Sequence, residues 1–332
     1  MKTWAMALTA SILFAHTTPA LAYLKFGVPV GGRSVILKWA STPARYYVWD
    51  RGASGLTSAD LQAAIARAFA TWQAVPTASV TYQFAGYTAA LPGDDDGLST
   101  LGFVSRPELS RVLASTSFLI DNATGELLES DIFFNAAFAW SVAPGGESGK
   151  FDLESIALHE IGHFSGLGHS ALGETELRPA GGRRVVAAEA IMFPIAFAAG
   201  SVSARTLRAD DIAGISDLYP DNGVDQNTGS VSGRVTQNGV GVFGAHIVAF
   251  DLGTGRMVGG FSLSAAGEFA IARLAPGPKV LRVEPLDDAD IEEFFSATSN
   301  VDLGFRVAFH DHLVVVPPGG DSGAVEIKVV PK

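Results

Sequence analysis

The sequence of 332 residues contains no cysteine. Disulfide bonds, iron–sulfur clusters, thiolate zinc sites and cysteine nucleophiles are therefore all excluded. Any metal that the protein binds must be held by histidine, aspartate or glutamate side chains. The seven histidines are the first candidates, because neutral imidazole is a common ligand of transition metals.

Basic residues are also scarce. The chain has 23 lysines and arginines against 34 aspartates and glutamates, which gives a formal net charge of -11 at pH 7. Such a chain has no general excess of cations to neutralise the phosphates of nucleic acids or the headgroups of acidic lipids. We therefore expect no nucleic-acid partner.

Long hydrophobic runs are missing as well. The longest mostly apolar run, residues 5–15, is shorter than the roughly 20 residues that a membrane-spanning helix needs. It follows Lys2 and precedes the small-residue pattern Ala20-Leu21-Ala22, which is typical of a signal-peptide cleavage site. The sequence thus predicts a signal peptide over 1–22. We expect a secreted or periplasmic monomer without a membrane anchor.

The length predicts about two domains. Proline, glycine and polar residues concentrate at 220–229, between a helix-like pattern and a series of short strand-like patterns. We therefore expect a first domain over 23–220, a linker over 221–228 and a second domain over 229–332.

The first domain mixes helical and strand patterns, so an α+β fold is expected. Leu61, Ile65, Phe69 and Trp72 recur at helical spacing behind a capping box at 57–60. The other predicted elements are strands at 46–49 and 80–84, a hairpin of 115–120 with 127–134, a helix from Asp152 and a helix over 208–218. These elements indicate a mixed, twisted sheet with three main helices.

The second domain consists of short strand patterns separated by turns. They lie at 230–235, 246–250, 257–262, 268–272, 280–284 and 324–330. This spacing predicts an all-β antiparallel sandwich. The turn glycines and the alternation in 229–235 and 244–250 resemble the carboxypeptidase-regulatory-like, prealbumin-type accessory domains.

The clearest chemical signal is the string HEIGHFSGLGH at 159–169. On a helix, His159 and His163 lie about 40° and 6 Å apart, so both imidazoles can reach one cation. His169 can join them only if the chain turns back after His163. Gly166 permits this turn, because glycine accepts the left-handed conformation that ends a helix. Three imidazoles would leave one coordination position for water.

Glu160 is the candidate general base. It follows His159 directly, so its carboxylate can flank the metal without replacing a histidine. Zinc would lower the pKa of a bound water and polarise a carbonyl, while Glu160 would move the proton. This arrangement predicts a zinc-dependent endopeptidase that forms no covalent intermediate.

The string resembles the signature of the metzincins, and residues 190–194 resemble their Met-turn. The resemblance implies that Met192 packs beneath the metal and is not a ligand. Ser170 after the third histidine and the stretch 207–219 are similar to the matrixins, the matrix metalloproteinase branch (peptidase M10). The resemblance covers about 39–220. It implies one catalytic zinc and a protein or peptide substrate.

The sequence departs from the matrixin pattern in its structural metal sites. Phe133, Asn135 and Phe138 stand where the family supplies a histidine for a structural zinc and acids for calcium, and Phe103 stands at a second histidine position. We expect apolar packing there and no imidazole-ligated structural zinc. Calcium at Asp94-Asp95-Asp96 stays open, although a solvated acidic loop is favoured because the EF-hand spacing is missing.

Two further departures concern latency and specificity. Vertebrate matrixins block their zinc with a prodomain cysteine, and a chain without cysteine cannot do so. The interval between His169 and Met192 is longer than is usual for matrixins and contains Arg178, Arg183 and Arg184. We expect this insertion, residues 171–190, to border the primed-side specificity pocket.

Two other functions are compatible with the sequence. A catalytically inactive metzincin-like protein could serve in binding or adhesion, but such a protein would often have lost Glu160. The second domain could instead be the active part by binding polymer surfaces, but residues 229–332 show no cluster of aromatic residues suited to that role.

Overall fold

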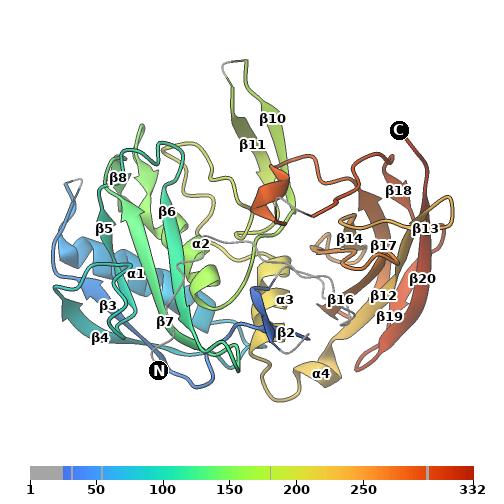
Figure 1. Ribbon diagram of the computed structural model, residues 1–332, viewed down its shortest axis with the longest axis horizontal. Coiled ribbons are helices and arrows are strands. Elements are labelled where there is room, and N and C mark those ends of the chain that lie inside the picture. The colour runs from blue at the N-terminus through green and yellow to red at the C-terminus, as the bar shows by residue number, and fades with distance from the viewer. Residues whose placement is uncertain (1–24, 31–32, 54, 180, 297–298) are drawn as a thin grey trace.

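The computed structural model describes residues 25–30, 33–53, 55–179, 181–296 and 299–332. The predicted signal peptide, 1–22, lies outside these residues. The chain forms two halves, a mixed α/β half and a β-rich half, with helix α3 between them (Figure 1). Among the described residues, no helix is long and apolar enough to cross a membrane.

The first half is built on a five-stranded sheet with the strand order β4-β3-β5-β7-β6. Strands β4, β3, β5 and β7 run parallel, and β6 pairs antiparallel with β7 at the edge. This confirms the predicted mixed sheet and the predicted hairpin. The strands span Tyr82–Thr88 (β4), Ala44–Trp49 (β3), Thr100–Val104 (β5), Leu127–Asn135 (β7) and Ala114–Ile120 (β6). Two-stranded ribbons are formed by Gly27–Val30 (β1) with Arg33–Ile36 (β2) and by Trp140–Ser141 (β8) with Phe151–Asp152 (β9).

Three main helices accompany this sheet, as predicted. They are α1 (Ser58–Gln73), α2 (Leu153–Phe164) and α3 (Ala209–Leu218). Helix α1 begins at the expected capping box and buries Leu61, Ile65, Phe69 and Trp72. The indole Nε1 of Trp72 donates to the carbonyl oxygen of Leu158 at 2.8 Å. This bond fixes α1 against α2.

The second half contains two sheets whose buried faces contribute to one core. One sheet consists of β12 (Gly229–Gln237), β13 (Val240–Gly241), β16 (Glu268–Leu274) and β20 (Asp321–Val329). The other consists of β14 (His246–Asp251), β15 (Met257–Phe261), β17 (Gly277–Glu284), β18 (Ala308–Phe309) and β19 (Val314–Val316). All six predicted strands of this half are present.

The prediction that this half is antiparallel throughout is wrong at one pair of strands. Strand β20 runs parallel to β12 over Ser230–Gln237. Parallel neighbours need a long connection, and the stretch 238–320, which contains β13 to β19, joins β12 to β20. Alternation of apolar and polar residues reveals a strand's buried face but not its direction, so the sequence pattern could not distinguish the two arrangements.

The two halves share one hydrophobic core. The buried cluster around Ile215 and Leu218 of α3 continues into Phe269 and Ile271 of β16. The stretch predicted as a linker, 221–228, contains the short helix α4 (Val224–Asn227), in which Val224 is buried.

Polar contacts reinforce this junction. The carboxylate of Asp210 accepts from the backbone N–H of Gly259 at 2.8 Å, and Arg273 pairs with Asp217 at 3.1 Å. Helix α3 is therefore bonded to strands of the second half as well as packed against them.

Asp152 begins α2, the helix that carries the histidine string. Its carboxylate caps the helix by accepting from the backbone N–H of Ser155 at 2.9 Å, as predicted. The same buried carboxylate pairs with the guanidinium of Arg205, whose Nε lies 2.9 Å from Oδ2. One side chain thus fixes the start of α2 and ties it to the segment before α3.

We expect Asp152→Ala to be less stable than Asp152→Asn, and Asp152→Asn to be less stable than the wild-type protein. Asparagine still caps a helix but loses the ion pair, whereas alanine loses both, and loss of a cap alone costs about 0.5–2 kcal/mol. The measurement is the free energy of unfolding from urea titrations. Asp95→Ala, at an exposed loop position, controls for loss of one negative charge. Equal stability of Asp152→Ala and Asp95→Ala would contradict the assigned role.

Candidate metal centre

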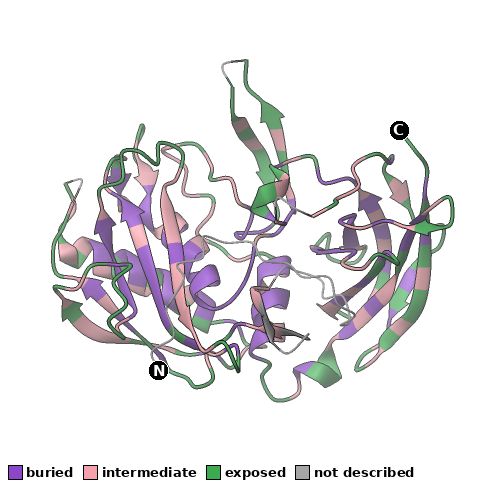
Figure 2. Ribbon diagram, in the orientation of Figure 1, coloured by how far each residue is buried: buried purple, intermediate pink, exposed green. Residues whose placement is uncertain are grey.

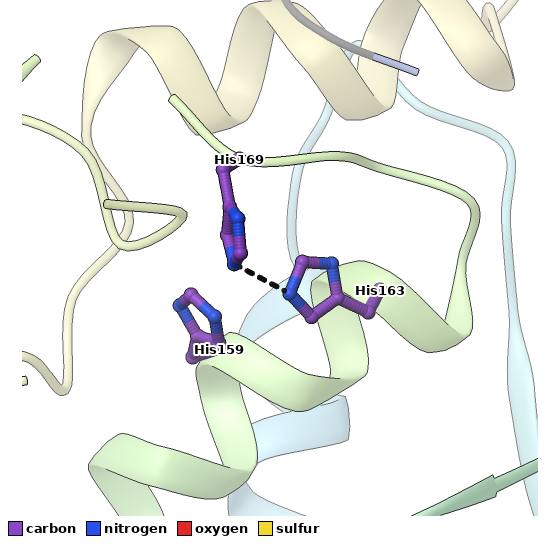
Figure 3. A group of neighbouring side chains, drawn as sticks. All are labelled: His159, His163 and His169. Atoms are coloured by element: carbon purple, nitrogen blue, oxygen red, sulfur yellow. Dashed lines mark hydrogen bonds between the residues drawn. The ribbon is translucent and has the colours of Figure 1, made fainter. Parts of the chain in front are cut away.

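Three histidines converge beside helix α2. His159 and His163 lie one turn apart on the helix, and His169 approaches them from the loop that follows (Figure 3). One nitrogen of each ring lies within 4.8 Å of the corresponding nitrogens of the other two. Nε2 of His163 and Nε2 of His169 are 3.2 Å apart.

The turn at Gly166 brings His169 back, as the sequence predicts. Gly166 has a φ of +102°, and a Cβ at this position would lie 2.3 Å from the carbonyl oxygen of Leu37. Its N–H donates to the carbonyl oxygen of His163 at 2.7 Å, and Leu167 N–H donates to that of Gly162 at 3.0 Å. Only glycine fits this helix end without strain.

Backbone carbonyl oxygens fix the orientation of all three rings. Nδ1 of His159 lies 2.7 Å from the carbonyl oxygen of Ile191, and Nδ1 of His163 lies 2.8 Å from that of Leu167. Nδ1 of His169 lies 2.7 Å from the carbonyl oxygen of Glu293. A carbonyl oxygen can only accept, so each neutral ring carries its proton on Nδ1. The three Nε2 atoms therefore present lone pairs to one another.

This arrangement fits a zinc ion. Burial lowers the pKa of all three histidines, that of His169 to about 3, which keeps the imidazoles neutral and able to ligate. The 3.2 Å contact between His163 and His169 brings two lone pairs together, because neither Nε2 has a proton to donate. Tetrahedral zinc with Zn–N bonds of 2.0–2.1 Å would separate two ligand nitrogens by about 3.3 Å. A cation between the rings would thus turn a repulsive contact into a favourable one.

Glu160 lies beside the histidines in a cleft of about 310 Å³, which is lined by all three rings and by residues 111–116. The Glu160 side chain is buried, and the hydroxyl of Thr116 on β6 donates to its Oε2 at 2.6 Å. Burial raises the pKa of Glu160 to about 7, while the bond from Thr116 opposes this shift. The carboxylate is held in place and can exchange a proton near neutral pH.

Met192 packs against the histidine helix, as the resemblance implies. A Cβ on Gly162 would lie 2.2 Å from Sδ of Met192, so the absence of a side chain at Gly162 makes room for the methionine. The buried carboxylate of Asp211 accepts from the backbone N–H groups of Ile191 and Met192 at 2.9 and 3.1 Å. Asp211 thereby fixes the turn whose carbonyl oxygen orients His159.

Three residues that support this site, Thr116, Asp211 and Glu293, were not predicted from the sequence. Thr116 and Asp211 belong to stretches that were predicted only as a strand and a helix. Glu293 lies 124 residues beyond His169 and contributes a backbone oxygen, which leaves no side-chain signature.

The structure places aromatic residues where the family has structural-metal ligands. Phe103 is buried, and its ring centroid lies 6.0 Å from those of Phe134 and Trp140, which confirms the expected apolar packing. Asn135 is also buried, and its Nδ2 donates to the carbonyl oxygen of Arg106 at 2.8 Å. The three aspartates at 94–96 are exposed, as expected for a solvated loop.

The insertion forms a hairpin of β10 (Gly173–Leu177) and β11 (Arg183–Ala188), which projects from the molecule and is largely exposed (Figure 2). Apart from Ala190, the described residues of the insertion 171–190 do not line this cleft, and a place beside the primed-side specificity pocket stays a prediction. Two of its arginines are engaged within the hairpin: Arg183 donates to Thr175 Oγ1 at 3.0 Å, and Arg184 to Glu176 at 2.7 Å.

Comparisons with known proteins place the site in context. The sequence model of the family described as Matrixin, Peptidase_M10, matches residues 38–220. The chain is 28% identical over 228 residues to "Metalloendoproteinase 1-MMP" of Arabidopsis thaliana, covering 63% of this chain and 49% of the relative. It is 30% identical over 197 residues to "Metalloendoproteinase 1" of Glycine max, covering 52% of each. The chain thus spans about half the length of these two curated relatives.

Among solved structures, the comparison gives "The Bacillus anthracis TIE protein", with a TM-score of 0.21 and 14% identity over 32% of this chain and 17% of the other. That score is too low to support an argument about the fold. The family match is different, because it extends over more than half of the chain and includes the histidine string and Met192. The chain belongs to the matrixin family.

Proposed function

We propose that this protein is a secreted zinc-dependent endopeptidase. In this proposal His159, His163 and His169 hold one catalytic zinc, and Glu160 is the general base. The observation that carries the proposal is the convergence of three imidazoles, each with Nδ1 bonded to a backbone carbonyl oxygen, beside a buried carboxylate. The names of the relatives, both metalloendoproteinases, support the same reaction class.

Zinc, Thr116 and Glu160 have different roles in the proposed hydrolysis. Bound zinc would supply a Lewis acid that lowers the pKa of a water and polarises the scissile carbonyl. Thr116 holds Oε2 of Glu160 at 2.6 Å, so Oε1 is the oxygen that accepts the proton of the attacking water. Glu160 then passes this proton to the departing amine nitrogen as the C–N bond breaks.

The substrate in this proposal is an extended peptide. Ala114 and Ser115 of the edge strand β6 line the cleft, and so do Ile191, Phe193 and Pro194. Strand β6 ends the sheet order, so a peptide can add to its outer edge through backbone hydrogen bonds. The apolar side chains would then select what enters the cleft.

Export and domain organisation complete the proposal. The signal-peptide pattern over 1–22 supports secretion or transfer to a periplasm, and the exported protein is proposed to be a monomer. The proposed domains are the peptidase at 23–220, a linker at 221–228 and a prealbumin-like accessory domain at 229–332. The main alternative is an inactive binding or adhesion protein. The buried, hydrogen-bonded Glu160 favours the enzyme, because adhesion does not require that carboxylate.

We expect the purified wild-type protein to bind one zinc ion per chain, and His159→Ala, His163→Ala and His169→Ala each to bind it more weakly. Removal of one neutral imidazole takes away a ligand while the other two remain. Metal analysis after dialysis against a chelator measures the occupancy. His310→Ala, at a site remote from the cleft, is the control. Undiminished occupancy in all three variants would reject the ligand assignment.

We expect Glu160→Gln to retain zinc but to lose about 10²- to 10⁴-fold in kcat/KM on a peptide substrate. The amide keeps the size of the side chain but cannot accept the proton. Turnover and zinc content are measured on the same samples, with Glu108→Gln at an exposed position as the control. A Glu160→Gln variant with half of the wild-type kcat/KM would show that Glu160 is not the base.

A further inference from the structure

A segment of the second half reaches the candidate metal centre. This segment, residues 286–295, follows β17 and contains the short helix η1 (Ile291–Glu293). The backbone oxygen of Glu293 accepts from Nδ1 of His169 at 2.7 Å, and Glu293 also lines the cleft. The ring of Phe294 meets the ring of His169 edge-on, with centroids 6.2 Å apart.

The three histidines differ in where their backbone partners come from. The partners of His159 and His163 are Ile191 and Leu167, which both lie within the matrixin match. The partner of His169 is Glu293, from the other half of the molecule. The first half alone therefore contains the backbone acceptors of only two rings.

Apolar packing docks the segment against the first half. Its buried residues form a cluster with Phe261 of β15 and with Ala171, which lies two residues after His169; Ile195, which follows the Met-turn, packs on the same cluster. The segment contributes Leu286, Ala289, Phe294 and Phe295 to this cluster. Residues of the segment before and after Glu293 are thus packed against the loop that follows His169.

The inserted hairpin holds the same segment. The backbone N–H of Thr175 donates to Oδ1 of Asp288 at 2.7 Å, and the Thr175 hydroxyl donates to the Asp288 carbonyl oxygen at 2.7 Å. Arg183 donates to the same hydroxyl oxygen at 3.0 Å. In Figure 1 the segment lies as an orange turn at the base of β10 and β11. The insertion between the third histidine and Met192 therefore contacts the segment that orients this histidine.

We propose that the second half is a structural part of the metal site. The segment 286–295, held by the β10–β11 hairpin, positions His169 for the metal through the backbone oxygen of Glu293. This inference rests on the proposed zinc site. In this proposal the hairpin does not form a wall of the cleft but positions His169 indirectly, through the bonds between Thr175 and Asp288.

The expected effect follows from the role of outer hydrogen-bond partners. A hydrogen bond to the distal nitrogen of a ligating histidine fixes the ring and its tautomer, and loss of such a partner typically costs 10- to 100-fold in metal affinity. Asp288→Ala and Thr175→Val loosen the segment without removing the Glu293 oxygen. We therefore expect a loss at the lower end, about 10-fold for Asp288→Ala and less for Thr175→Val.

The test measures zinc affinity of the full chain by competition with a chelator. Asp288→Ala and Thr175→Val are each made in the wild-type background and in the His169→Ala background. Asp287→Ala is the matched control, because it removes the same charge from the neighbouring, exposed position. Thermal unfolding of each apoprotein identifies a temperature at which the variants are folded. If Asp288→Ala is not folded there, Thr175→Val alone is used for the comparison.

The inference requires weaker zinc binding in the wild-type background only, because without the His169 ring the segment has no ligand to orient. Zinc binding equal to that of Asp287→Ala would overturn it. An equal loss in both backgrounds would also overturn it, since the segment would then act on overall stability. Failure of the proposed function gives a different result: the wild-type chain would bind no zinc, or His169→Ala would bind it as tightly as wild type.

Discussion

The candidate site depends on three hydrogen bonds from imidazole Nδ1 atoms to backbone carbonyl oxygens. A free histidine can place its proton on either nitrogen, and these bonds select the tautomer that turns Nε2 toward the centre. The carbonyl oxygens belong to Ile191, Leu167 and Glu293, which lie in three separate stretches of chain. The fold must bring these three stretches next to helix α2 and the loop that follows it.

Each stretch is fixed by a different physical device. The backbone conformation of Gly166 places the Leu167 carbonyl oxygen next to His163, and the buried carboxylate of Asp211 holds the turn that contains Ile191. Hydrophobic packing around Phe295 holds the stretch that contains Glu293. The helix that carries His159 and His163 is in turn fixed by the indole of Trp72 and by its cap at Asp152. Packing or hydrogen bonds therefore hold the helix of two histidines and the backbone partner of each of the three rings.

Local signals made much of this predictable from sequence. Helical spacing, a capping residue and a turn glycine act within a few residues, so α1, α2 and the return of His169 could be predicted from local sequence. The place of Met192 was instead implied by the resemblance to the metzincins. The role of the Glu293 oxygen could not be predicted, because every residue has a backbone carbonyl oxygen and the side chain of Glu293 therefore gives no signal. In addition, 124 residues separate Glu293 from its partner His169. The direction of β20 and the path of the inserted hairpin were also hidden, since both are decided by packing between distant segments.

The core that runs from α3 into β16 has a consequence for how this chain can have diversified. Accessory modules joined by loose linkers can be exchanged by recombination without harm to an enzyme. Here an exchange would expose the apolar face around Leu218 and leave the carboxylate of Asp210 without the Gly259 N–H. The two halves therefore pack as one unit, and a substitution on one side of their junction should be tolerated best with a compensating change on the other.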